Sequence, residues 1–254
     1  MDEAEWLMTE NVQAMIDLIT AAHSRHGEPA LVSFKKIRLF ECAVCRHVWD
    51  AKNCRQCGGL KMIVLPYNED TEGGFAVCDS CGATGRTPSL TNGDCRDAVK
   101  VAEHFIDGQV GYEAMREFRE TLPNLDHPDF AQMQLVINCC MADGWRQAGV
   151  LCEVASYHFK VPVRELADIL RDVIGNPFRD HDYTILPVPS LAAQTAVDMA
   201  KTIYNNRAYE RLPILADALE DAGCGKADVL DHLRLLGTHV RGCWALDVVA
   251  GNKR

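Results

Sequence analysis

The chain has 254 residues, a formal net charge of −10, and 48% hydrophobic against 24% charged residues. This length is sufficient for one large or two small domains, and the balanced composition excludes a wholly disordered chain. No apolar run is long enough to span a membrane, and the acidic start Met1-Asp2-Glu3 differs from the basic start of a signal peptide. We therefore expect a cytoplasmic protein with no membrane partner, whose 12 cysteines are reduced thiols or metal ligands.

Two amphipathic segments open the chain. Apolar side chains recur at three- and four-residue steps over residues 2–24 and again over 36–49, and this period predicts helices. Cys42 and Cys45 lie in the second segment, and no glycine follows either of them. We therefore interpret both as small apolar residues of a packed helix rather than as metal ligands.

A small zinc ribbon is predicted next, over residues 51–94. Cys54-x-x-Cys57-Gly and Cys78-x-x-Cys81-Gly each offer two thiolates from one tight turn, and two such turns complete a tetrahedral site. The 20 residues between Cys57 and Cys78 have the pattern of a strand, a turn-rich loop and a strand. These four cysteines are assigned to one structural Zn²⁺, because four thiolates leave no open position for water. An alternative ribbon remains open, with cysteines 42, 45, 54 and 57.

The rest of the chain is predicted to be helical. The expected helices cover residues 95–107, 110–121, 128–158 with a break near Gly144 or Gly149, 162–174, 190–206, 213–222, 226–236 and 241–250. Pro213 near the start and Gly223 just past the end mark one of them clearly. The fold class is therefore mainly α. A multi-helix domain covers 1–50 and 95–254, with a C-terminal subregion of about 190–254, and the two-stranded β zinc ribbon is an insertion over 51–94.

The C-terminal third concentrates Cys224, His232, His239 and Cys243. His239 and Cys243 are four residues apart, which on a helix would place them on one face. With Cys224 and His232 they could complete a second zinc site. Because the spacing is loose, we favour a packed helix junction with buried cysteines and hydrogen-bonded histidines. No nucleophile, zinc-protease or phosphate-loop motif is present, so no residue receives a catalytic role.

Several stretches resemble an uncharacterised planctomycete-type helical family. Its motifs match EAEWL at 3–7, KIRLFECAVCRHVW at 36–49, AVKVAEHFIDG at 98–108, ILRDVIGNPFRD at 169–180, RLPILADALEDAGC at 211–224 and HVRGCW at 239–244. Members of the family pass almost directly from the second of these helices to the third, where this chain has about 44 further residues. The resemblance implies a helical fold with the ribbon, itself similar to restriction-alleviation-type zinc ribbons, as an insertion. It implies no activity.

The sequence therefore favours a non-enzymatic, zinc-containing binding or adaptor protein with a protein partner. A first alternative is nucleic-acid binding through residues 35–61, where seven basic residues accompany two acidic ones. The net charge of −10 opposes this alternative, because it repels phosphate. A second alternative is a metal-dependent hydrolase that uses the C-terminal histidines and cysteines.

Overall fold

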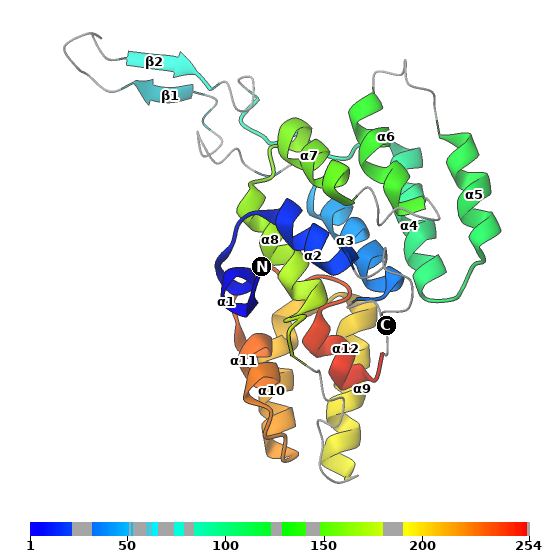
Figure 1. Cartoon of the computed structure of the whole chain (residues 1–254), viewed down its shortest axis with the longest axis vertical. Helices are drawn as coiled ribbons and strands as arrows, with labels where there is room; N and C mark the ends of the chain where they lie inside the picture. Colours follow the sequence, from blue (N-terminus) through cyan, green and yellow to red (C-terminus); the bar gives the residue numbers. More distant parts are fainter. Residues whose placement is uncertain are drawn as a thin grey trace. The chain divides into compact units, whose positions relative to one another are not determined.

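The computed structural model describes residues 1–21, 32–50, 52, 60, 62–65, 74–78, 84–122, 129–140, 148–179 and 190–252. The chain forms two compact units, one of residues 1–43 with 163–254 and one of residues 44–162. The described residues are mainly helical, as the sequence predicts (Figure 1). Each helix in these ranges is too short or too polar to cross a lipid bilayer.

The first unit joins the two ends of the chain. Its helices are α1 (Glu3–Met8), α2 (Val12–Ala21), α8 (Val163–Ile174), α9 (Leu191–Asn206), α10 (Leu212–Asp221), α11 (Ala227–Arg234) and α12 (Trp244–Ala250), together with the first part of α3 (Phe34–His47). Helix α10 packs against α11 and α9, and α9 packs against α12 (Figure 1). Buried apolar side chains of these four helices form one core, which includes Ile203, Leu215, Leu219, Leu233 and Leu246.

Helix α8 is amphipathic over its whole length. Leu166, Ile169, Leu170 and Val173 recur at three- and four-residue steps and are fully buried. Gly175 follows the helix with a φ of 76°, the left-handed conformation that glycine commonly adopts just past a helix end. Asp172 lies beside Val173 and is only 3% exposed, so α8 carries a carboxylate into the interior of the unit.

The predicted helix over residues 2–24 is wrong in one respect, because it is two helices. Asp2 and Glu5 form a capping box at the start of α1, and Thr9 ends α1 in an extended conformation. The Asn11 side chain then accepts a hydrogen bond from the backbone N–H of Ala14 at 3.0 Å, at the start of α2. Local capping residues therefore interrupt a continuous apolar pattern.

The second unit contains the remaining helices and a pair of strands. Its elements are the end of α3, β1 (Met62–Leu65), β2 (Gly74–Val77), α4 (Gly93–Ile106), α5 (Tyr112–Thr121), α6 (Phe130–Ile137), η2 (Asn138–Cys140) and α7 (Ala148–Phe159). The strands pair antiparallel, with Met62 opposite Val77 and Leu65 opposite Gly74. Cys78 directly follows β2 and is buried. Cys54, Cys57 and Cys81 lie outside the described residues, so the zinc ribbon and its 51–94 boundaries stay a prediction.

Cys42 and Cys45 lie on α3, where the sequence places them on a packed helix. Both are buried, at 2% and 0% exposure. The thiol of Cys45 lies 3.8 Å from the carbonyl oxygen of Leu135 and 3.6 Å from Sγ of Cys139. Their predicted position on a packed helix is confirmed, and the alternative ribbon with cysteines 42, 45, 54 and 57 stays open because Cys54 and Cys57 lie outside the described residues.

Candidate metal centre

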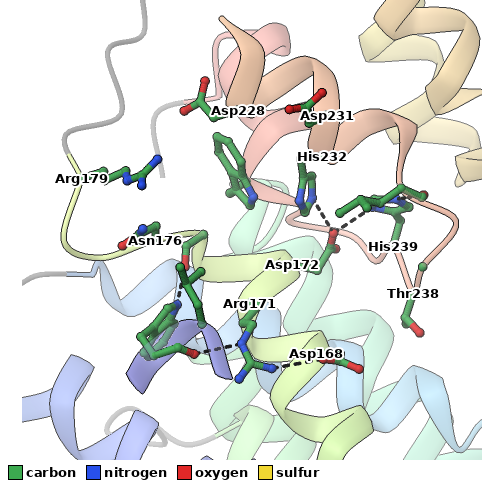
Figure 2. A pocket seen from close by; sticks show the side chains of 16 residues that line it. Asp168, Arg171, Asp172, Asn176, Arg179, Asp228, Asp231, His232, Thr238 and His239 are labelled. Carbon is green, nitrogen blue, oxygen red and sulfur yellow. Dashed lines mark hydrogen bonds and ion pairs between the residues drawn. The ribbon is translucent and has the colours of Figure 1, made fainter. Parts of the chain in front are cut away.

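Four side chains of the first unit converge on one point. They are Asp172, His232, His239 and Cys243, and one ligand atom from each lies within 4.8 Å of the others. Figure 2 shows the two imidazole rings directed at the Asp172 carboxylate. Carboxylate, imidazole and thiolate are all metal ligands, and imidazole with thiolate suits zinc in particular.

Three different elements supply these side chains. Asp172 comes from the buried face of α8, and His232 comes from α11, whose neighbouring Leu233 is buried in the core. His239 lies in the segment between α11 and α12, and Cys243 is the N-cap residue of α12. The predicted placement of His239 and Cys243 on one helix face is therefore wrong, because both precede α12.

The turn before α12 fixes the position of Cys243. Gly242 has a φ of 96°, a conformation that favours glycine. A Cβ at this position would lie 2.9 Å from Cδ1 of Leu39, so the backbone approaches α3 more closely than any larger residue permits. Cys243 follows this glycine directly and is fully buried.

The spacing of the donor atoms resembles the edges of a small coordination tetrahedron. Oδ1 of Asp172 lies 3.0 Å from Nε2 of His232 and 2.9 Å from Nδ1 of His239. Sγ of Cys243 lies 3.3 Å from Nε2 of His232 and 3.9 Å from Nδ1 of His239. Zinc bonds of about 2.0–2.3 Å imply tetrahedral edges of roughly 3.3–3.6 Å, which fall inside this range.

A second contact of His239 sets which nitrogen faces the cluster. Nε2 of His239 lies 3.1 Å from the carbonyl oxygen of Leu235, which is only an acceptor, so Nε2 carries a hydrogen and donates it. In the neutral ring Nδ1 is then unprotonated and directs its lone pair at the Asp172 carboxylate. Two acceptors at 2.9 Å require a proton or a metal ion between them. A backbone carbonyl on the far nitrogen is the usual support of a metal-bound histidine.

The same atoms do not form a Cys–His–Asp catalytic triad. A triad holds the carboxylate on one ring nitrogen and the nucleophile on the other. Here Nε2 of His232 faces both Asp172 and Cys243, and Nδ1 of His239 also faces both. The donors therefore point to a common centre, as metal ligands do, and not along a proton relay.

Burial and charge set the protonation of the cluster. Burial alone raises the pKa of the Asp172 carboxyl, but hydrogen bonds from His232 and His239 and the charges of both rings hold it below its ordinary value. Burial alone lowers the pKa of His239, yet the hydrogen bond and charge of Asp172 raise it overall. Burial, and then the charge of Asp172, raise the pKa of the Cys243 thiol well above its usual range. A metal ion is the group that would turn this buried thiol into a thiolate.

A buried lysine braces the two backbone segments that carry Asp172 and Cys243. Nζ of Lys36 donates to the carbonyl oxygens of Val173 at 2.8 Å and Gly242 at 2.7 Å. The same ammonium lies 2.9 Å from Oδ2 of Asp247, and both side chains of this ion pair are buried. Lys36 therefore ties the end of α8 to the start of α12 from behind the cluster.

A cavity of about 440 Å³ adjoins the cluster within the first unit. Its lining residues include Asp172, His232 and His239 but not Cys243. Trp6, Leu235 and Trp244 contribute apolar surface, and acidic side chains of α11 lie at its edge (Figure 2). Three of the four donor residues therefore border the cavity.

The structure brings together three of the four C-terminal residues that the sequence singled out. Cys224 is not among them, because it is buried in the α9–α12 core. Its place is taken by Asp172, which the sequence analysis missed. The available signal was an aspartate on the otherwise apolar face of α8, a position where an unpaired carboxylate is costly.

Several basic side chains of the segment over residues 35–61 are buried or ion-paired within the two units. Lys36 and Arg38 are buried, and Arg46 makes a two-pronged ion pair with Glu103 at 2.6 and 3.1 Å. Among its described basic residues, Lys35 and Lys52 are exposed. Nucleic-acid binding stays a prediction, with less exposed charge in its favour than the sequence suggests.

No family model, no curated protein and no solved structure matches this chain. The resemblance to the planctomycete-type helical family stays a prediction.

Proposed function

We propose that the chain is a non-enzymatic zinc-binding protein whose metal is held by Asp172, His232, His239 and Cys243. The observation that carries the proposal is the convergence of four donor atoms within 4.8 Å, two from buried and two from partly buried residues. The contact of His239 with Asp172 fits it, because Nδ1 and Oδ1 at 2.9 Å need either a proton or a metal ion between them.

Charge balance also supports zinc at this cluster. A carboxylate and a thiolate together bring two negative charges, which a divalent ion neutralises. Asp172 and Cys243 are nearly inaccessible to water, at 3% and 0% exposure, so an uncompensated charge there is expensive. The mixture of nitrogen, sulfur and oxygen donors is suited to zinc rather than to calcium or magnesium, which prefer oxygen alone.

The role proposed for this zinc is structural. Its ligands come from α8, α11 and the middle and end of the α11–α12 connection, so one ion would fix these elements together. Four protein donors form a closed tetrahedral site. A surface held rigid by a bound metal fits a role as a binding or adaptor protein. The sequence favours this role, with another protein as the partner.

A metal-dependent hydrolase is a second candidate, and the cavity is the observation that favours it. Three of the four donors line this cavity, which gives a small molecule a route to the metal. Zinc enzymes keep a position open for water, whereas this cluster offers four donors. We therefore rank hydrolysis below structural binding.

The predicted ribbon zinc at Cys54, Cys57, Cys78 and Cys81 forms part of the same proposal. Two antiparallel strands and a buried Cys78 support it. An isolated pair of four-residue strands is marginal without further support, which a bound metal supplies. The proposal therefore expects two zinc ions for each chain.

Metal content in matched variants tests both sites. Purified protein is loaded with Zn²⁺, dialysed and measured by elemental analysis. Cys243→Ser and His239→Asn should each lower the zinc content by one equivalent, and Cys54→Ser with Cys78→Ser should remove the other. Cys224→Ser is the matched control, because this thiol is buried in the same unit but lies outside the cluster. An unchanged zinc content in the Cys243→Ser and His239→Asn proteins refutes the proposal.

A further inference from the structure

The cavity beside the cluster has a defined relation to the donor atoms. Asp172, His232 and His239 form part of its wall, while Cys243 does not. A metal ion held by all four donors would therefore adjoin the cavity on the side of these three residues. Four protein donors close the tetrahedron, but zinc sometimes expands to five ligands, and a donor atom from the cavity would join the ion in this way without displacing a side chain.

The cavity wall has an aromatic part close to the metal ligands. The ring of Trp244 lies 5.0 Å from the ring of His232, centroid to centroid. Trp6 also lines the cavity, and its Nε1–H donates to the carbonyl oxygen of Gly175 at 3.0 Å, which fixes the indole. Tryptophan faces bind apolar groups and also attract cations.

Two carboxylates of the cavity wall have no partner among the ion pairs of the described residues. Asp168 pairs with Arg171 at 3.1 Å, and Arg179 pairs with Glu3 at 2.6 Å. Asp228 and Asp231 make no ion pair or hydrogen bond with any residue that the structure describes.

These two aspartates stand one turn apart on α11. Asp228 is also one turn before His232, so it shares a helix face with a metal ligand. Figure 2 shows both carboxylates on the same side of the cavity as His232. Zinc with Asp172 and Cys243 is electrically neutral, so the aspartates leave the cavity with a negative charge.

Resting on the proposed metal site, we infer that this cavity binds a small organic cation that carries a metal-coordinating nitrogen. The ligating nitrogen would occupy the fifth position on the ion. The cationic end, an ammonium or a guanidinium, would lie between the tryptophans and the carboxylates of Asp228 and Asp231. The class of ligand is therefore a small amine with a second nitrogen donor a few atoms away.

The test compares two probes that differ in the charge of one end. Histamine and imidazole-4-acetate both carry an imidazole that can bind the metal, but the first has an ammonium tail and the second a carboxylate. The full chain is loaded with Co²⁺, whose visible spectrum changes when a fifth ligand joins, and each probe is titrated in. Exposed charge pairs contribute modestly, so we expect histamine to bind about fivefold to tenfold more tightly.

Variants show which side chains cause the preference for histamine over imidazole-4-acetate. Asp228→Asn with Asp231→Asn should bring the two affinities to within about twofold of each other. Asp221→Asn on α10 is the matched control, since it removes an exposed aspartate that does not line the cavity, and it should keep the preference. Metal content measured after each titration shows whether the probe has joined the ion or removed it.

The outcomes separate this inference from the proposed function. Absence of a thiolate–Co²⁺ band that depends on Cys243, before any probe is added, overturns the metal site and the ligand inference together. A normal band with no probe binding, with equal affinities, or with tighter binding of imidazole-4-acetate overturns the ligand inference alone.

Discussion

Lys36 provides a sharp test of how the cluster is supported. Its ammonium donates to two backbone carbonyls and pairs with Asp247, whose side chain is 3% exposed. Lys36→Met keeps the apolar stem of the side chain but leaves the Asp247 carboxylate buried without a counter-ion. Breaking a buried ion pair in this way costs about 3–5 kcal/mol, and we expect the free energy of unfolding to fall by this amount.

Urea unfolding followed by circular dichroism measures the effect. Lys35→Met is the matched control, because Lys35 is exposed on the same helix and its loss should change stability by less than about 0.5 kcal/mol. Lys36→Met combined with Asp247→Leu removes both buried charges and should recover most of the lost stability. A loss below about 1 kcal/mol in Lys36→Met, or a double variant no more stable than the single one, refutes the reasoning.

Two further predictions concern neighbouring parts of the first unit. Burial raises the pKa of Glu41 to about 8 against the opposing charge of Arg38, so the folded state holds a proton that the unfolded state releases. Glu41 alone should therefore make wild-type stability fall between about pH 4.5 and 8 by up to about 1.4 kcal/mol per pH unit. In denaturant titrations Glu41→Gln should lose this part of the pH dependence and keep the part that comes from other groups such as His239. Equal pH profiles of the two proteins contradict this. Gly242→Ala should lower the free energy of unfolding by about 1–3 kcal/mol and weaken zinc binding. Gly225→Ala is the matched control and should do neither, because a Cβ at Gly225 would have no atom within 4 Å.

The helices could largely be predicted from the sequence, because their signals are local. Apolar period, Pro213 near the start and Gly223 past the end set α10 almost to the residue, and Gly223 adopts the expected positive φ of 88°. The break between α1 and α2 was missed because the apolar period continues through it. Only the caps at Thr9 and Asn11 mark it, and these are weak signals in an amphipathic run.

The candidate site could be predicted only in part. His232, His239 and Cys243 lie within 12 residues of the sequence, so their grouping was visible. Asp172 is 60 residues before His232, and only the packing of α8 against the later helices brings it to them. Cys224 was grouped with them by spacing, but the apolar core of α9–α12 takes it up instead. Sequence proximity selects candidates, and tertiary packing decides which of them become neighbours.

Zinc K-edge X-ray absorption on the Cys54→Ser, Cys78→Ser protein examines the Asp172, His232, His239 and Cys243 cluster apart from the predicted ribbon. We expect one retained zinc with one sulfur neighbour at about 2.3 Å and three nitrogen or oxygen neighbours at about 2.0–2.1 Å. We also expect the sulfur contribution to disappear when Cys243→Ser is added. A protein that retains no zinc, or a zinc whose sulfur neighbour survives the loss of Cys243, would show that this cluster is not the proposed metal site.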